Sequence, residues 1–172
     1  MNISKNFKNK TFSKATISCL IITVIVFFLD RFSKIKIISL QENSSESIFI
    51  NDYLNFDLVW NTGIGFGLFS QNANIYYHLI SLLIFSIIIF IFYLIAKSIF
   101  IEKILLSLIL GGAMGNCYDR LFYYAVPDFI DLHINNFHWF IFNVADIFIT
   151  LGVICLIYAE IFFNKGKDEQ SI

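Results

Sequence analysis

The sequence predicts a membrane protein, an all-α bundle of four transmembrane helices with a small extracytoplasmic β-sheet. Three observations support this prediction. Apolar residues make up 58% of the 172 residues and charged residues only 15%, so a soluble fold of this size could not cover its apolar surface. Four stretches are apolar over nearly the length that a spanning helix needs, about 20 residues. Between the first two, the residues alternate as in a β-strand.

The transmembrane helices are expected over residues 13–30, 75–97, 103–119 and 140–163. Basic residues precede the first helix, as they do in signal peptides, but no A-x-A-like cleavage site follows it. We therefore interpret it as a retained helix. It ends at the charged Asp30, and the third helix ends at Asp119. The fourth helix begins with aromatic residues, which are typical of a membrane interface.

A β-strand is predicted from Tyr53 to Trp60, because apolar residues occupy every even position of this segment. Glycines at positions 63, 65 and 67 follow it and supply flexible backbone. The sequence shows no internal repeat and no second domain. We therefore expect one membrane-embedded domain over residues 1–172, with the small sheet lying on the outer end of the helix bundle.

The distribution of lysine and arginine predicts the orientation in the membrane. Eight basic residues fall in the N-terminal segment, the connection between the second and third helices, and the C-terminal tail, and four fall at the other ends of the helices. Because cytoplasmic segments carry the excess of positive charge, both termini are expected to be cytoplasmic. The longer segments, residues 31–74 and 119–138, are expected to face outward as loops.

Several functional classes are excluded by composition and motif. The net charge is −1 and no basic face is evident, so a nucleic-acid partner is not expected. The sequence contains neither a G-x-S-x-G nor an H-E-x-x-H motif. Its histidines, His78, His133 and His138, show no metal-ligand spacing, and its three cysteines are too widely spaced for a disulfide framework. Neither a metal nor a cofactor is therefore expected.

Polar residues gather where the helices should meet the outer membrane surface. The set at the helix ends is Asp30, Gly112, Asn116, Asp119, Arg120, Asn143 and Asp146. Asp128 and Asp131 lie in the adjoining segment, which is expected to be a loop, so they can reach the same level. Because ionisable groups at membrane depth are costly, such a cluster is usually functional.

The spacings support a shared site. Four of these residues in the third helix, from Gly112 to Arg120, are related by three- and four-residue steps and so share one face. Asn143 and Asp146 share a face of the fourth helix in the same way. Asp30 at a helix C-terminus opposes the helix dipole and should have a cationic partner, for which Lys34 and Arg120 are the candidates.

A structural interpretation of these residues stays open. Asp119 and Arg120 would then be interfacial caps of the third helix, Asp30 a boundary charge that snorkels, and the glycines sites of helix packing. A non-enzyme, such as a transporter subunit or an assembly chaperone, is the corresponding functional alternative. However, a conduction path would spread polar residues through the membrane depth, whereas these residues gather on one side.

Paired aspartates are the remaining route to catalysis. Two aspartates that share one proton can activate water without a metal, because the ionised carboxyl accepts a proton while the neutral one polarises the scissile carbonyl. Such a pair needs two aspartates from different elements, held within a few Å at an occluded site. On sequence alone, Asp119 and Asp128 compete for one of the two positions.

Five motifs taken together resemble those of the lipoprotein signal peptidases. They are FFLDRFSK around Asp30, WNTGIGFGLFS around Asn61, GGAMGNCYDR ending at Arg120, VPDF around Asp128, and FNVAD ending at Asp146. The resemblance covers nearly the whole chain, with the motifs in the family's order. One departure is Pro127, which replaces the usual valine and should stiffen the loop that carries Asp128.

The resemblance implies a membrane aspartyl endopeptidase that removes signal peptides from diacylglyceryl-modified prolipoproteins, cleaving before the lipid-modified cysteine. It implies that Asp128 and Asp146 are catalytic and that Asp119 has a supporting role. The family's other supporting residues fall on Asp30, Asn61, Asn116, Arg120 and Asn143. The expected fold has four transmembrane helices and a small β-cradle. We expect a monomer in the bacterial inner membrane, in contact with lipid, with its active site at the outer face. Asp128 is expected to hold most of the shared proton.

Overall fold

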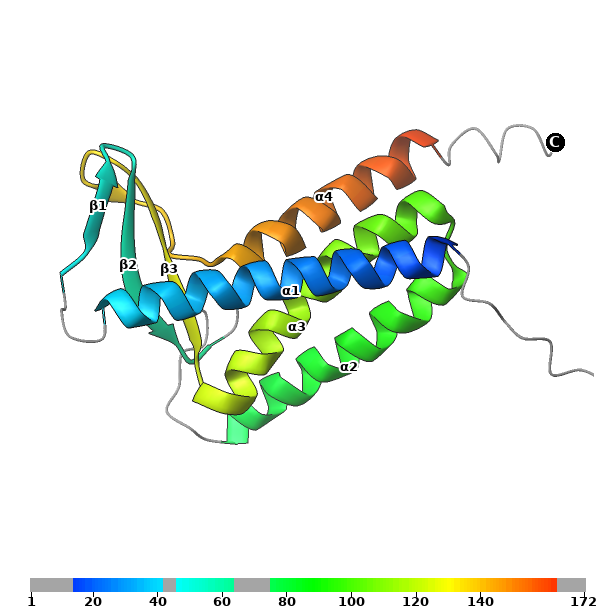
Figure 1. Cartoon of the computed structure of the whole chain (residues 1–172), viewed down its shortest axis with the longest axis horizontal. Coiled ribbons are helices and arrows are strands. Elements are labelled where there is room, and N and C mark those ends of the chain that lie inside the picture. Colours follow the sequence, from blue (N-terminus) through cyan, green and yellow to red (C-terminus); the bar gives the residue numbers. More distant parts are fainter. Residues whose placement is uncertain (1–13, 42–45, 64–74, 164–172) are drawn as a thin grey trace, which may run out of the picture.

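The computed structural model describes residues 14–41, 46–63 and 75–163 (Figure 1). These ranges contain four helices: α1 (Lys14–Gln41), α2 (Ile75–Lys97), α3 (Phe100–Tyr123) and α4 (Val144–Phe163). Each includes a stretch that is long and apolar enough to cross a membrane. They also contain an antiparallel sheet in the order β1 (Ile48–Asn51), β2 (Leu54–Asn61), β3 (Val126–Ile134) and β4 (Phe137–His138). The predicted fold class is therefore confirmed.

Helix α3 is the central element of the bundle and the most buried of the four spans. Glycines allow its neighbours to approach closely. A Cβ atom added at Gly111 would overlap Val26 of α1, and one added at Gly112 would overlap the backbone carbonyl of Ala145 in α4. The outer surfaces of α2 and α4 expose large apolar side chains, as lipid-facing helices do.

Helix α1 extends to Gln41, and the prediction that it ends near residue 30 is wrong. The charged residues that suggested an end are buried against α3, where Asp119 pairs with both Arg31 and Lys34. The extension supports the sheet, because the Gln41 side-chain oxygen accepts a hydrogen bond from the backbone N–H of Leu58 at 2.9 Å.

The sheet confirms the one predicted strand and contains three further strands. Strand β2 covers residues 54–61, close to the predicted 53–60. Residues 119–138 do not form a loop: α3 continues to Tyr123, and β3 follows after Tyr124, whose φ of 57° is left-handed. Pro127 therefore lies in a strand, opposite Trp60 of β2. The predicted flexibility at Gly65 and Gly67 falls outside the described residues.

The sheet lies at one end of the bundle, and the start of α1 and the end of α4 lie at the other (Figure 1). Strand β3 leads from the end of α3 into the sheet, and the chain after β4 returns to the bundle at the start of α4. The elements that carry the predicted catalytic aspartates therefore meet where the sheet joins the helices.

Candidate active site

Asp146 lies in the first turn of α4, in a reciprocal arrangement with Asn143. The Asn143 side-chain oxygen accepts a hydrogen bond from the Asp146 N–H at 3.1 Å, and the Asn143 N–H donates to Asp146 Oδ2 at 3.2 Å. This is the geometry of a capping box, which satisfies N–H groups that have no partner within the helix. The other carboxylate oxygen, Oδ1, accepts a hydrogen bond from Asn116 Nδ2 of α3 at 2.9 Å. Asp146 is therefore fixed from two helices, at a position where the helix dipole favours negative charge.

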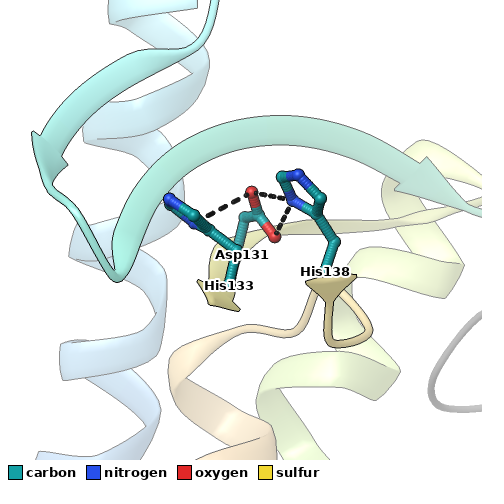
Figure 2. A group of neighbouring side chains, drawn as sticks. All are labelled: Asp131, His133 and His138. Atoms are coloured by element: carbon teal, nitrogen blue, oxygen red, sulfur yellow. Dashed lines mark hydrogen bonds and ion pairs between the residues drawn. The ribbon is translucent and has the colours of Figure 1, made fainter. Parts of the chain in front are cut away.

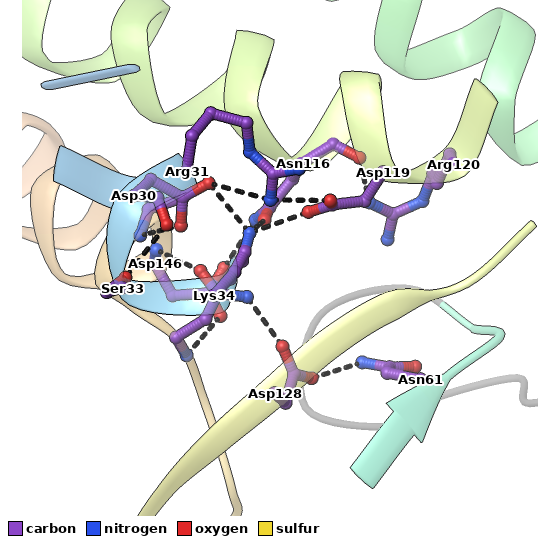
Figure 3. A network of polar contacts seen from close by, with 12 residues as sticks. Asp30, Arg31, Ser33, Lys34, Asn61, Asn116, Asp119, Arg120, Asp128 and Asp146 are labelled. Atoms are coloured by element: carbon purple, nitrogen blue, oxygen red, sulfur yellow. Dashed lines mark hydrogen bonds and ion pairs between the residues drawn. The ribbon is translucent and has the colours of Figure 1, made fainter. Parts of the chain in front are cut away.

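Asp128 lies on β3, and its side chain is 3% exposed. Its Oδ1 accepts a hydrogen bond from Asn143 Nδ2 at 2.5 Å, and its Oδ2 accepts one from Asn61 Nδ2 at 2.9 Å. The amide of Asn143 thus contacts both aspartates, through Nδ2 to Asp128 and through Oδ1 to the Asp146 backbone. Figure 3 shows Asp128 and Asn61 below the charged cluster that lies between α1 and α3.

The pKa of Asp128 is raised from 3.8 to about 6. Burial is the main cause, because it disfavours the charged form, and the charge of Asp146 adds to it. The hydrogen bonds from Asn143 and Asn61 oppose the shift but do not cancel it. Asp128 therefore holds a proton over a range of pH in which an exposed aspartate is ionised.

Lys34 is the centre of a buried ion-pair network beside the aspartates (Figure 3). Its Nζ is fully buried and donates three hydrogen bonds: to Asp30 Oδ2 at 2.8 Å, to Asn116 Oδ1 at 2.7 Å and to Asp119 Oδ2 at 2.7 Å. Arg31 forms a second ion pair with Asp119, at 2.5 Å. Two cations thus balance two carboxylates, and Lys34 orients the Asn116 amide that binds Asp146.

The network also fixes the start of α4. Asp30 Oδ1 accepts a hydrogen bond from the backbone N–H of Ala145 at 3.0 Å. The other oxygen of Asp30 accepts the bond from Lys34, one of its two predicted partners. Sequence reasoning had given Lys34 no role beyond this pairing, and the four-residue step from Asp30 was its only signal.

The remaining predicted residues have different surroundings. Arg120 donates to the carbonyls of Asn116 at 3.1 Å and Gly63 at 3.0 Å, and Asn61 Oδ1 accepts from the Gly63 N–H at 2.9 Å. Arg120 therefore stabilises the turn that follows Asn61 through its hydrogen bond to Gly63. Gly112 allows α4 to approach α3 closely. Asp131 is on the far part of β3, where it contacts His138.

Two apolar cavities meet at Asp146. One, of about 280 Å³, lies among α2, α3 and α4; it is lined mainly by isoleucines and reaches Asn116 and Arg120 at its polar end. The other, of about 410 Å³, lies between α4 and the segment that precedes it, and it is lined by residues such as Trp139 and Phe142. The partly buried carboxyl of Asp146 is thus accessible from spaces that suit apolar chains.

Comparisons with known proteins show which proteins this chain resembles. Residues 22–162 match a family described as signal peptidase (SPase) II. The lipoprotein signal peptidase of Pelagibacter ubique (strain HTCC1062) is 51% identical over 152 residues, which cover 88% of this chain and 92% of that protein. That of Anaplasma phagocytophilum (strain HZ) is 40% identical over 144 residues, covering 83% and 90%. A solved structure described as a bacterial membrane enzyme is 28% identical, with a TM-score of 0.70, covering 90% of this chain and 94% of that one.

Proposed function

Because this chain belongs to the signal peptidase II family and is a lipoprotein signal peptidase, we propose that Asp128 and Asp146 are its catalytic pair. One observation carries the proposal: the amide of Asn143 contacts both residues, which come from different elements and are both held by further amides. The charge of Asp146 also raises the pKa of Asp128, so the two carboxyls interact, and interacting carboxyls can share one proton. Asp119 lies within the ion-pair network, and we assign it a supporting role.

The proposed reaction uses the two aspartates in opposite protonation states. Ionised Asp146 accepts a proton from water as the water oxygen attacks the scissile carbonyl carbon, and protonated Asp128 donates its proton to the carbonyl oxygen. When the tetrahedral intermediate collapses, the C–N bond breaks and the leaving nitrogen takes the proton from Asp146. The carbonyl re-forms and returns a proton to Asp128, so the pair is restored.

The surroundings of the two residues support this assignment of roles. Asp146 lies at a helix N-terminus and accepts the backbone N–H of Asn143 and the amide of Asn116. Asp128 lies on a strand, without a helix dipole, and burial raises its pKa to about 6. The positive end of the helix dipole at Asp146 favours the ionised base, and the burial of Asp128 favours the protonated acid.

We also propose that the substrate carries a diacylglyceryl group, because both cavities that reach Asp146 are apolar. Lipid burial contributes about 0.8 kcal/mol per CH₂ group, so removing the acyl chains should reduce kcat/KM by several orders of magnitude. The measurement compares a synthetic prolipoprotein peptide with the same peptide that has an unmodified cysteine. Equal cleavage of the two peptides would contradict lipid recognition. Cleavage of neither by wild-type enzyme, when a known lipoprotein signal peptidase cleaves the first, would contradict the activity itself.

This multi-pass bacterial membrane protein should have its active site at the outer membrane face and both termini in the cytoplasm. The support is the excess of lysine in the sequence before α1, between α2 and α3 and after α4, since α1 begins and α4 ends at the end of the bundle away from the sheet. Reporter fusions after residue 172 and within residues 42–50 test the orientation. We expect the first to report a cytoplasmic location and the second an external one. An external C-terminus would place the aspartates at the wrong face.

A further inference from the structure

Asp131, His133 and His138 form a cluster in the outer part of the sheet (Figure 2). Asp131 and His133 are two residues apart on β3, so their side chains leave the same face of the strand. His138 lies directly opposite His133 in the pairing of β3 with β4. Asp128 is three residues before Asp131, and its side chain leaves the opposite face. The cluster is thus separate from the proposed catalytic pair.

The potential ligand atoms of the cluster converge. His138 Nδ1 lies 2.9 and 3.1 Å from the two Asp131 carboxylate oxygens, and His133 Nδ1 lies 3.7 Å from Oδ2. One atom from each of the three residues lies within 4.8 Å of the other two. The two rings are stacked, with centroids 5.1 Å apart.

Two features are left unexplained by an ordinary Asp–His hydrogen bond. The His133 Nδ1 atom is buried and has no hydrogen-bond partner among the described residues. Asp131 is only 4% exposed, although its carboxylate faces two imidazoles and no arginine or lysine pairs with it in the described part of the chain. A buried polar nitrogen without a partner is costly, and an ion between the three groups would supply one.

We propose that Asp131, His133 and His138 bind a divalent transition-metal ion of the Zn²⁺ type. Two imidazole nitrogens and one carboxylate oxygen are ligands that zinc accepts, whereas Mg²⁺ and Ca²⁺ require oxygen ligands. Tetrahedral ligands about 2.1 Å from an ion lie roughly 3.4 Å apart. The distances from Asp131 Oδ2 to His138 Nδ1 and to His133 Nδ1, 2.9 and 3.7 Å, lie on either side of this value. The His138 side chain is exposed, so it can shift to admit the ion and leaves a path of entry from solvent.

The ion would link β3 to β4 by binding side chains from both strands, and it would not take part in peptide cleavage. The hairpin of these strands belongs to the segment that joins Asp128 to Asn143. Its pairing within the described residues consists of two residue pairs, His133 with His138 and Ile134 with Phe137. A metal clamp would add to this short pairing and stabilise the connection between the two catalytic elements.

Equilibrium dialysis of purified, full-length protein in detergent tests the proposal, provided that no polyhistidine tag remains. The dialysis uses ZnCl₂ with Mg²⁺ in millimolar excess, and the readout is zinc bound per chain. We expect one zinc ion per chain for wild type. His133→Phe and His138→Phe should each weaken zinc binding at least about tenfold, because each removes one of three ligands. Phenylalanine preserves an aromatic ring at the stacked position.

The third histidine of the chain supplies a matched control. His78 is exposed on α2, so His78→Phe should bind zinc as wild type does. Zinc should also raise the unfolding temperature of wild type and of His78→Phe, but not that of the two cluster variants. The proposal is overturned if wild type binds no zinc, or if His133→Phe binds it as tightly as wild type does. Loss of binding in all three variants would equally overturn it, since the site would then not depend on the cluster.

Discussion

Asp128→Asn and Asp146→Asn are each expected to reduce cleavage of a lipid-modified prolipoprotein by about 10⁴-fold, to near the background rate. In the proposed mechanism each aspartate serves as both proton donor and proton acceptor within one turnover, and an amide can do neither. General acid–base groups contribute about 10²–10⁴-fold each, so the upper end of this range applies to a residue that serves in both steps. The measurement is kcat/KM for each purified variant.

Asp52→Asn is the matched control, because Asp52 is exposed in the turn between β1 and β2. It makes the same chemical change without touching the pair, and we expect it to cleave at the wild-type rate. The amount of folded protein is measured for all three variants, so that loss of activity is separated from loss of protein. Cleavage near the wild-type rate by either Asp128→Asn or Asp146→Asn would contradict the aspartyl mechanism.

The two variants should differ in their binding of a transition-state mimic, such as a peptide with a hydroxyl group at the scissile position. In the Asp128→Asn variant the introduced amide can donate a hydrogen bond in place of the protonated acid, so this variant should keep more affinity. Asp146→Asn removes the charge that the helix N-terminus stabilises and should bind the mimic more weakly. The opposite order would reverse the assignment of acid and base.

The parts of the fold that could be predicted are those set by local patterns. Lipid-facing helices are apolar along their length, and β2 alternates, so the four helices and this strand were predictable. Strand β3 was missed because it is buried at successive positions, 126–129, and so lacks alternation. It also contains Pro127 and two aspartates, a composition that usually indicates a loop. The length of α1 was missed because Asp119, which neutralises its charges, is distant in sequence.

In the site, too, the features set by local sequence patterns were predictable, and those that depend on tertiary packing were not. The Asn143–Asp146 pair could be read from its three-residue step, since a capping box has a local signature. The central position of Lys34 could not, because it depends on how α1 packs against α3. The cluster of Asp131 with the two histidines was also missed. Its spacing fits no helical metal motif, and only the strand pairing brings His138 to His133.

Lys34→Met is expected to cause the largest loss of stability of any single change in the ion-pair network. Lys34 is fully buried, and its three acceptors would lose their common donor while methionine preserves most of the volume. Removing one partner of a buried ion pair costs roughly 3–5 kcal/mol, because the remaining charge is left uncompensated. Here Arg31 would have to balance both Asp30 and Asp119. The readout is the free energy of unfolding of the purified protein in detergent.

Lys36→Met is the control for this substitution, because Lys36 is exposed and lies two residues further along α1. The free energy of unfolding of the Lys36→Met protein should stay within about 0.5 kcal/mol of that of wild type. In Lys34→Met, Asn116 loses the bond that orients its amide, so its hydrogen bond to Asp146 Oδ1 should weaken. The folded fraction of Lys34→Met should therefore show a reduced kcat, which a purely structural role would leave unchanged. If Lys34→Met unfolds like Lys36→Met, the buried network does not stabilise the fold. If it is less stable but its folded fraction cleaves at the wild-type kcat, Lys34 holds the helices together without positioning Asp146.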